Sequence, residues 1–361
     1  MRKASKIFLI LFILFSVITP CGFLSGAGKG EYYVNQGHVE SVTNPDKEEP
    51  LADLGQKDEE GVIFNLCVFG DNRPANDKLA QPQSFKNLVE NMINYGPELY
   101  FNTGDIINGG TTNLDIINRE FTDYLEVVEG LDCPGFVSCG NHDVANKTSA
   151  RLFEEMVNAK SFAAALNSGT SVYFPAPDAA LILHSPALKN AEFTRDQDLY
   201  YHFSYKSMYF IILYAYQEGS WGAIEGKQLE WLENILSRLK DEKVFVFVHP
   251  PVYSFLNPGC ITDGSLHVAF SSRKNQDHIR NLFKEFKVDA VFSGHEHMYR
   301  MEQHDGTTYI ISGCSGAFPY ASEEEGGFLH FIEIKIKEDT WEMSVIDKNG
   351  NLFYSKELGF N

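Results

Sequence analysis

The sequence predicts an α/β fold with a parallel central sheet, and two observations indicate it. Short apolar runs with almost no polar alternation occur at 62–69, 99–101 and 135–137, as expected for strands covered on both faces. Segments with apolar residues at helical spacing separate these runs. This alternation of strands and helices implies parallel strands joined by right-handed crossovers.

Two amphipathic helices are expected to cover this sheet, and Ser84 is predicted to cap the first of them. Their apolar residues recur every three or four positions, which places them on one face of each helix. The inward residues are Phe85, Leu88, Val89, Met92 and Ile93 in the first helix, and Ile117, Phe121, Tyr124, Leu125 and Val128 in the second.

The second half of the chain predicts a further sheet with more antiparallel character, because its last runs alternate apolar and polar residues. The expected elements are two strands within 200–214 that turn at Lys206 and Ser207, a helix at 225–240, buried strands at 243–249 and 288–292, a helix around Ile279 and Phe283, strands at 308–312, 328–337 and 340–346, and a short last strand after a turn at 348–350.

The N-terminal region is expected to lie outside the folded domain. Residues 1–27 resemble a secretory signal, because a basic start precedes an apolar run that is too short to span a bilayer. Two processing sites compete, one at small residues ending at Ala27 and one of lipoprotein type that ends before Cys21. The protein is therefore expected to be exported, as a secreted or periplasmic protein or a cell-surface lipoprotein, and to reach a membrane only through a lipid at its N-terminus.

The remaining chain divides into two parts by composition. Residues 28–60 are polar and are expected to form a linker or arm. The folded domain is expected over 61–355, with a less regular insertion or cap at about 144–198 that contains a helix near 149–166.

Charge and cysteine content exclude some classes of partner and fold. The net charge of −19 repels nucleic acid and anionic membranes, so we expect no nucleic-acid partner. The chain has six cysteines, and they follow no zinc-finger spacing. The sequence leaves disulfides and the oligomeric state open.

Five apolar runs end in residues that bind metal ions. These ends are Gly70-Asp71, Gly104-Asp105, Gly140-Asn141-His142-Asp143, His249 and Gly294-His295-Glu296-His297. In a sheet with parallel strands such ends lie at one edge, so these residues are expected to meet. Carboxylates, imidazoles and one amide oxygen suit a pair of first-row metal ions, which together hold the attacking and leaving oxygens of a phosphoryl transfer. The glycines before the ligands are expected to let the backbone turn sharply.

These motifs resemble those of the calcineurin-like metallophosphoesterases, and their flanks are most similar to the branch that includes the purple acid phosphatases. The resemblance covers about residues 61–345. It implies a four-layer α/β/β/α sandwich of two mixed sheets that binds two metal ions. The sequence leaves the metals open, since oxygen-rich sites with imidazole accept iron, manganese or zinc. The resemblance also implies hydrolysis of a phosphoester, with a small phosphorylated molecule as the partner and a metal-bound hydroxide as the nucleophile.

The resemblance implies a role for each motif residue when it is carried over by position. The first metal would be held by Asp71 and His297, the second by Asn141, His249 and His295, and both by the bridging Asp105. His142 would lie outside the metal ligands and either protonate the leaving alkoxide or stabilise charge on the phosphoryl oxygens. Asp143 would orient His142.

Two positions depart from the family pattern. Where many members have a histidine two residues after the first aspartate, this chain has Arg73, a permanent cation that cannot bind a metal. Where the purple acid phosphatases have a tyrosine three residues after the bridging aspartate, it has Asn108. Asn108 or water is therefore expected to complete a weaker first site without purple colour. Arg73 is expected to clamp a phosphate oxygen, with a surface ion pair as the alternative.

Several functions are compatible with these residues. Asn72, Tyr253, Tyr299 and Arg300 flank the ligands and are expected to line the substrate pocket, with simple packing as the alternative. The favoured function is hydrolysis of a small phosphomonoester. The alternatives are a phosphodiesterase for nucleotide or lipid head-group diesters, and a degenerate binding module without activity. A hydrolase of C–N or C–O bonds fits less well, because asparagine among aspartate and histidine ligands is the phosphoesterase pattern.

Overall fold

The computed structural model describes residues 61–158, 171–173, 199–217, 220–256 and 270–361. The chain divides into two units, and all described elements belong to the second, at residues 44–361. The expected signal, the linker and most of the expected insertion lie outside the described residues. Within the described part, no helix has the length and apolar character needed to cross a membrane.

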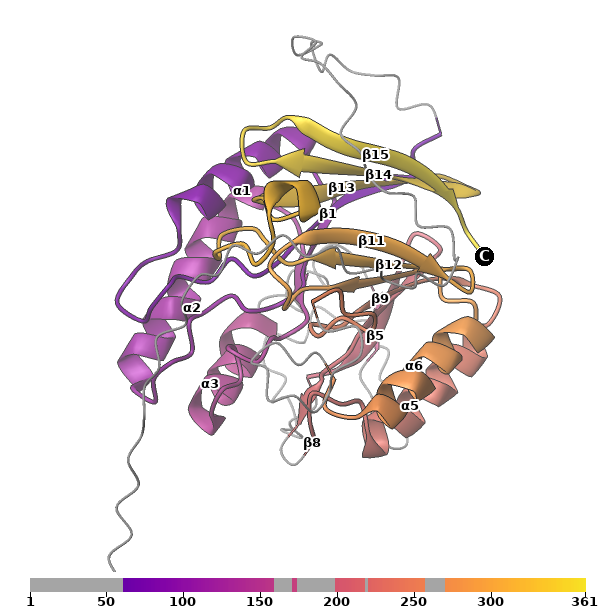
Figure 1. The fold of residues 1–361 in the computed structure, drawn as a ribbon, viewed down its shortest axis with the longest axis horizontal. Coiled ribbons are helices and arrows are strands. Elements are labelled where there is room, and N and C mark those ends of the chain that lie inside the picture. Colours follow the sequence, from indigo (N-terminus) through magenta and orange to yellow (C-terminus); the bar gives the residue numbers. More distant parts are fainter. Residues whose placement is uncertain (1–60, 159–170, 174–198, 218–219, 257–269) are drawn as a thin grey trace, which may run out of the picture. The chain divides into compact units, whose positions relative to one another are not determined.

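Two mixed sheets form the centre of the second unit (Figure 1). The first has six strands in the order β15 (Leu352–Gly359), β14 (Thr340–Asp347), β13 (His330–Ile336), β1 (Phe64–Phe69), β2 (Leu99–Asn102) and β3 (Gly135–Val137). Strands β1, β2 and β3 are parallel, as the sequence predicts, whereas β13, β14 and β15 extend the sheet in antiparallel fashion.

The second sheet has seven strands and a parallel centre. Their order is β11 (Tyr299–His304), β12 (Thr307–Ser312), β10 (Ala290–Ser293), β9 (Lys243–Phe247), β6 (Met208–Ile212), β5 (Tyr201–Tyr205) and β4 (Ser171–Tyr173). Strands β12, β10, β9 and β6 are parallel, and the strands at both edges are antiparallel. A separate hairpin pairs β7 (Tyr216–Gln217) with β8 (Ser220–Trp221).

The alternation of side chains along each strand produces the layers. In β1, Leu66 and Val68 belong to the core between the two sheets, whereas Cys67 belongs to the core on the helical side. Between the sheets, the rings of Phe101 and Phe247 stack with their centroids 4.1 Å apart. Because both faces of the strand are buried, it appears in the sequence as a continuous apolar run.

Helices cover the outer face of each sheet, which completes the four predicted layers. Figure 1 shows α1 (Gln83–Tyr95) and α2 (Leu114–Val128) along one side, and α5 (Gly226–Arg238) and α6 (Arg273–Glu285) along the other. The short helix α3 (Lys147–Leu152) follows β3. The prediction of an α/β/β/α sandwich is confirmed.

Some details of the predicted elements are wrong. Helix α1 begins after Pro82, whose carbonyl accepts the first helical hydrogen bonds, so Ser84 lies inside the first turn and is not the cap. Ile93 is 44% exposed, because it lies at the edge of the apolar face. The predicted turn at Lys206 and Ser207 is confirmed, and both residues have positive φ, as tight hairpins require.

Two strands differ from their prediction for a physical reason. Strand β11 was not expected, because its sequence is largely polar, and it is stabilised as an edge strand by pairing with β12. The last strand, β15, has eight residues where a short strand was expected. Its half-exposed residues give a weak pattern, and pairing along β14 sets its length.

Candidate metal centre

The six predicted ligands lie where the parallel strands of both sheets end, and they meet as three pairs. Asp71 Oδ1 lies 3.3 Å from His297 Nε2, and Asp105 Oδ1 lies 3.5 Å from His249 Nε2. The third pair joins Asn141 Oδ1 and His295 Nδ1 at 3.1 Å. In every pair the oxygen follows a strand of the first sheet and the nitrogen follows a strand of the second. The site is therefore a seam between the two sheets.

Hydrogen bonds to backbone carbonyls fix the orientation of two imidazoles. His249 Nδ1 donates to the Thr103 carbonyl at 2.7 Å, and His297 Nδ1 donates to the Phe318 carbonyl at 2.7 Å. Because a carbonyl can only accept, Nδ1 carries the proton and Nε2 presents a lone pair to the facing carboxylate. Metal-binding histidines are commonly held in this way.

Some polar atoms of these pairs lack a hydrogen-bond partner among the described residues, and a bound cation would coordinate them instead. Asp71 Oδ1 and His249 Nε2 are buried and have no hydrogen-bond partner within the described part of the chain. Asp71, Asp105 and His297 offer donor atoms that all lie within 4.8 Å of one another. Burial lowers the pKa of His249, but the Asp105 and Asp71 carboxylates outweigh burial and raise it. The residues thus fit a metal ion, since an uncompensated buried donor is costly.

Three of the ligand residues have left-handed backbone conformations. The φ angles of Asp71, Asp105 and His295 are 51°, 55° and 68°, which costs a non-glycine residue roughly 1–3 kcal/mol. The expected turning role of the glycines is thus largely wrong, and a positive φ occurs only at Gly104 among the four glycines that precede ligands. At Gly140 the reason for glycine is space, because a Cβ there would lie 2.1 Å from Asp105 Oδ1.

His142 lies beside the ligands and is held from two directions. Its backbone N–H donates to Asp105 Oδ1 at 3.0 Å, and its ring Nδ1 donates to the Asn108 carbonyl. The other ring nitrogen, Nε2, lies 3.9 Å from Asp105 Oδ2. The side chain is half-buried. The imidazole is thus fixed at Nδ1 and presents Nε2 to the site.

Asn108 differs from its predicted role as a metal ligand. Its side-chain oxygen accepts from the Gly110 N–H at 3.3 Å, and its amide nitrogen contacts the Pro74 carbonyl at 3.4 Å. Its backbone N–H donates to Glu120, which is buried on α2. Asn108 therefore acts through its backbone, as the residue that orients His142.

The prediction that Asp143 orients His142 is also wrong. The Asp143 carboxylate accepts from the backbone N–H groups of Asp105, Ile106 and Gly140 at 2.8–2.9 Å. Burial and the nearby Asp105 carboxylate raise the pKa of Asp143, while these N–H groups favour its charged form. Asp143 thus joins the loops that carry Asp105 and Asn141, because its oxygens are occupied by their backbone.

Arg73 lies at the edge of the site. Its Nε is 3.7 Å from Asp105 Oδ2, and its side chain is mostly buried. Burial raises the pKa of Asp105, but His249, His142 and Arg73 together outweigh burial and keep it below its usual value. Arg73 also interacts with the Tyr320 hydroxyl. A guanidinium in this position supplies positive charge next to the predicted bridging carboxylate.

The predicted substrate residue Asn72 is part of a buried amide network instead. Its amide donates to Gln81 Oε1 at 2.9 Å, and its oxygen accepts from Asn102 Nδ2 at 2.8 Å. Gln81 in turn donates to the Ile106 carbonyl. Because both ends of the Asn72 side chain are occupied, it supports the loops after β1 and β2 from behind.

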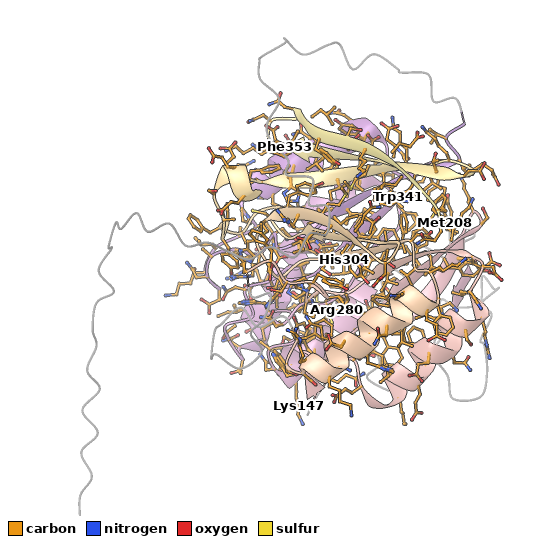
Figure 2. All side chains as sticks on the ribbon, turned by 45° about the vertical axis from the view of Figure 1, so that its right-hand side comes forward. Lys147, Met208, Arg280, His304, Trp341 and Phe353 are labelled. Atoms are coloured by element: carbon orange, nitrogen blue, oxygen red, sulfur yellow. The ribbon has the colours of Figure 1, made fainter. Side chains whose placement is uncertain are left out.

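The other three predicted substrate residues make packing or ion-pair contacts, and their role toward a substrate stays a prediction. Tyr299 is 5% exposed and belongs to the core between the sheets. The Tyr253 ring stacks on the His304 ring with their centroids 3.9 Å apart, and the Arg280 guanidinium also lies over the Tyr253 ring. Figure 2 labels His304 and Arg280. Arg300 pairs with Glu302 at 3.0 Å.

Several residues of the site had no signal in the sequence that we recognised. Glu296, inside the His-x-His motif, accepts from the backbone N–H groups of Phe255 and Leu256 and holds that segment. Tyr320 stacks on His297 with ring centroids 3.8 Å apart. Phe318 supplies the carbonyl that holds His297. A loop without a motif carries Phe318 and Tyr320, so only the fold reveals them.

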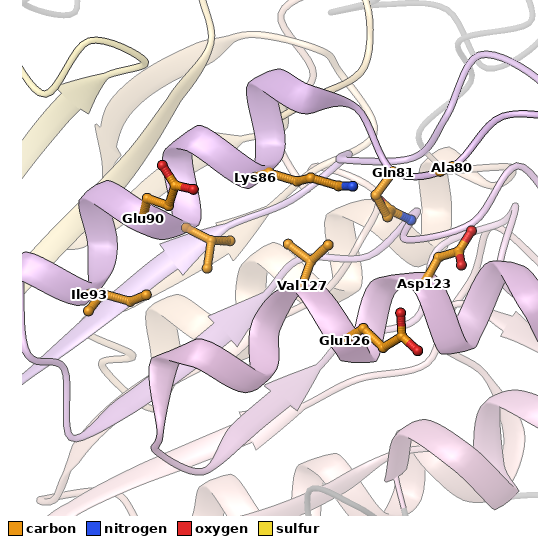
Figure 3. Close-up of a pocket in the computed structure, with 9 residues that line it drawn as sticks. Ala80, Gln81, Lys86, Glu90, Ile93, Asp123, Glu126 and Val127 are labelled. Carbon is orange, nitrogen blue, oxygen red and sulfur yellow. The ribbon is translucent and has the colours of Figure 1, made fainter.

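A pocket of about 330 Å³ lies between α1 and α2, away from the predicted ligands. Figure 3 shows Lys86 and Glu90 on one helix, and Asp123 and Glu126 on the other, among the residues that line it. The pocket includes Gln81 of the amide network, but none of the predicted metal ligands lines it. It therefore contributes nothing to the metal centre directly.

Comparisons with known proteins give the same assignment as the geometry. The mouse, rat and human tartrate-resistant acid phosphatases type 5 are 28%, 24% and 24% identical to the chain, over 150, 149 and 149 residues. These alignments cover 36% of this chain and 42% of each relative, so the chain spans less than half the length of these relatives.

Solved structures show a similar fold at low identity. A dimetal phosphatase from Danio rerio is 14% identical with a TM-score of 0.58, and the match covers 83% of this chain and 100% of that one. Purple acid phosphatase PPD1 from yellow lupin is 15% identical with a TM-score of 0.52, covering 82% and 53% of the two chains. GAP50, described as the anchor in the inner membrane complex of Plasmodium, is 15% identical with a TM-score of 0.52, covering 82% and 89%.

The comparison with family models is decisive for membership. The model of the calcineurin-like phosphoesterases matches residues 51–299, which include all six predicted ligands. This confirms the resemblance noted from the motifs, which is to a family of metal-dependent phosphoric ester hydrolases. The chain belongs to the calcineurin-like phosphoesterase family.

Proposed function

We propose that the protein hydrolyses a small phosphomonoester with the help of two metal ions. The observation that carries this proposal is the set of three oxygen–nitrogen pairs between the two sheets. In two of them a backbone carbonyl holds Nδ1, so Nε2 faces the carboxylate. Asp71 and His297 would hold the first ion, Asn141, His249 and His295 the second, and Asp105 both. Bound there, the ions would lower the pKa of the attacking water and balance charge on the phosphoryl oxygens.

His142 would supply the proton that the leaving alkoxide needs. The Asn108 carbonyl keeps one proton on Nδ1, so the proton delivered to the leaving oxygen would be the second one, carried on Nε2 of the imidazolium. The contact between the His142 N–H and Asp105 keeps this imidazole next to the bridging carboxylate. General-acid catalysis of this kind contributes about 10²–10⁴-fold to the rate.

Arg73 would bind the phosphate directly. Its Nε is buried and has no hydrogen-bond partner in the described part of the chain, although Asp105 lies 3.7 Å away. A guanidinium can donate two parallel hydrogen bonds to phosphate oxygens, which holds the phosphoryl group in one orientation. Arg73 would thus take the place of the family histidine as a residue for substrate rather than for metal.

Metal analysis combined with a phosphoester panel tests the proposal. We expect about two ions per chain and faster turnover of p-nitrophenyl phosphate than of bis(p-nitrophenyl) phosphate. Faster turnover of the bis ester would favour the phosphodiesterase, and bound metal without turnover of either ester would favour a binding module. The His142→Asn variant should lose about 100-fold in kcat on an alkyl phosphate. It should lose much less on p-nitrophenyl phosphate, whose leaving group needs no proton.

We also propose that the protein is exported, on the evidence of its basic and apolar N-terminus. Mass spectrometry of the protein recovered from its own cells tests this idea. Cleavage after Ala27 would indicate a secreted or periplasmic protein, whereas a lipid on Cys21 would indicate a cell-surface lipoprotein. An intact N-terminus would contradict both.

A further inference from the structure

Two aromatic side chains lie beside the metal centre, in the loop that follows β12. Phe318 is 84% exposed and Tyr320 is 36% exposed. The Tyr320 ring lies parallel to the His297 imidazole, at a centroid distance of 3.8 Å and an angle of 12°. We call the side chains of Phe318 and Tyr320 the aromatic platform. Within the platform, the Tyr320 ring borders the ligand pair formed by Asp71 and His297.

The backbone of the platform is held to the metal ligands. The Ala317 N–H donates to the Asp71 carbonyl at 2.8 Å, and the Tyr320 N–H donates to the His297 carbonyl at 3.0 Å. Between them, the Phe318 carbonyl accepts from His297 Nδ1. The Phe318 ring is therefore exposed on a fixed backbone, and its exposure does not come from a fraying loop.

The platform also borders the predicted phosphate site. Arg73 interacts with the Tyr320 hydroxyl and lies 3.7 Å from Asp105 Oδ2. The predicted acid, His142, lies 3.9 Å from the same carboxylate oxygen. A phosphoryl group held by Arg73 would therefore have the acid on one side and Tyr320 on another, and Phe318 precedes Tyr320 by two residues in the same loop.

Single exposed apolar side chains are ordinary on protein surfaces. The platform must therefore differ from the other exposed aromatic residues of this protein. Phe353 is 39% exposed on β15 and packs on Phe328 at 4.3 Å; Figure 2 labels it on that strand. Trp221 is 50% exposed and packs on Tyr216 with the two rings tilted by 53°. The platform differs from both, because it places two aromatic rings within three residues on backbone that is bonded to predicted metal ligands.

We infer that the aromatic platform binds a planar ring in the alcohol part of the substrate, so that the enzyme favours aryl phosphomonoesters over alkyl ones. This inference rests on the proposed function and names its substrate class. An aromatic ring in the leaving alcohol would lie against Phe318 by stacking or edge contact. Tyr320 would hold the Arg73 guanidinium and the His297 imidazole while the ring binds.

Steady-state kinetics with two esters tests the inference. The quantity measured is the ratio of kcat/KM for phenyl phosphate to kcat/KM for glycerol 2-phosphate. Phe318→Ala should lower this ratio about three- to tenfold, because the KM for phenyl phosphate rises. Phe318→Trp, which keeps an aromatic ring, should have the same ratio as the unsubstituted protein. Phe353→Ala, an equal truncation of another exposed ring, should leave the ratio unchanged. An equal loss on both esters, or a loss of the ratio in Trp221→Ala instead, would overturn the inference.

A binding measurement separates this inference from the proposed function. Phenylphosphonate and methylphosphonate have no ester bond, so calorimetry on the metal-loaded protein measures recognition of the ring alone. The protein should bind phenylphosphonate more tightly, and Phe318→Ala should abolish the difference. If neither ester is turned over, the proposed function fails while this preference still decides the inference. If both esters are turned over but the preference is absent, the inference fails and the function stands.

Discussion

At the scale of single residues, the metal centre depends on neighbours that never touch the predicted metals. The carbonyls of Thr103 and Phe318 fix His249 and His297, and the Asn108 carbonyl fixes His142. The motifs predicted six ligands because their residue types and order are distinctive. They could not identify these carbonyls, because any residue supplies one.

Glu120 is the residue whose effect on His142 is most easily tested. Its buried carboxylate accepts from the Asn108 N–H at 3.0 Å, and burial raises its pKa. Glu120→Ala should lower the free energy of unfolding by about 1–3 kcal/mol, because it leaves that N–H without its acceptor. It should also lower kcat. Glu120→Gln keeps an acceptor for the Asn108 N–H and should therefore keep most of the free energy of unfolding and most of kcat. Urea unfolding and kinetics measure the two effects, and equal losses in both variants would exclude this role.

His330 predicts how stability depends on pH. Burial lowers its pKa from 6.5 to about 4, and its Nδ1 donates to the Phe328 carbonyl. The unfolded chain therefore takes up a proton near pH 6.5 that the folded chain refuses until about pH 4. Stability should fall by about 3 kcal/mol as the pH drops through this window. His330→Asn should remove this part of the slope in unfolding measured from pH 7 to pH 4, and an unchanged slope would contradict the assignment.

At the scale of elements, the site depends on how closely the strand ends approach one another. The apolar runs predicted β1, β2, β3, β9 and β10 because buried parallel strands leave a clear pattern. The pattern could not show that Asp71, Asp105 and His295 themselves adopt positive φ, since even aspartate and histidine, which tolerate that conformation better than most residues, adopt it only occasionally. The contacts between loops impose it, which is why the structure corrected the expected role of the glycines.

Gly140 tests this close approach. A Cβ at this position would lie 2.1 Å from Asp105 Oδ1 and 2.5 Å from the Asp105 backbone nitrogen. Gly140→Ala should lower the free energy of unfolding by more than about 2 kcal/mol and reduce the metal content, because the loop with Asp105 must move. Gly359→Ala is the matched control, since a Cβ there meets nothing within 4 Å. Equal stability of the two variants by thermal unfolding would refute the argument.

At the scale of the whole molecule, the metal centre joins the two sheets. The sequence predicted two sheets, and it predicted that the strand ends with the candidate ligands would meet at one edge. It did not predict that each oxygen–nitrogen pair would join a residue of one sheet to a residue of the other. How the two sheets stack depends on side chains spread over the entire chain. Phe101 and Phe247, stacked between the sheets, are two of them.

Removal of the metals should therefore lower the stability of the whole domain. Each ion bound only by the folded state adds about 2.7 kcal/mol at a free concentration of a hundred times Kd. Calorimetry should show a lower Tm after chelation and recovery on adding metal back. Asp71→Asn should recover less, since one of its oxygens faces His297. The same recovery in this variant would mean that Asp71 does not hold a metal.

The three pairs between the sheets also determine the order in which the metal-binding atoms are synthesised. Their oxygens come from Asp71, Asp105 and Asn141, all in the first half of the chain, and their nitrogens from His249, His295 and His297, all in the second half. A chain still emerging from the ribosome has only the oxygen donors, which suit hard ions such as Mg²⁺. The imidazoles that favour iron or zinc arrive last. Metal binding by all six predicted ligands is thus a step that only a chain already extended past His297 can take.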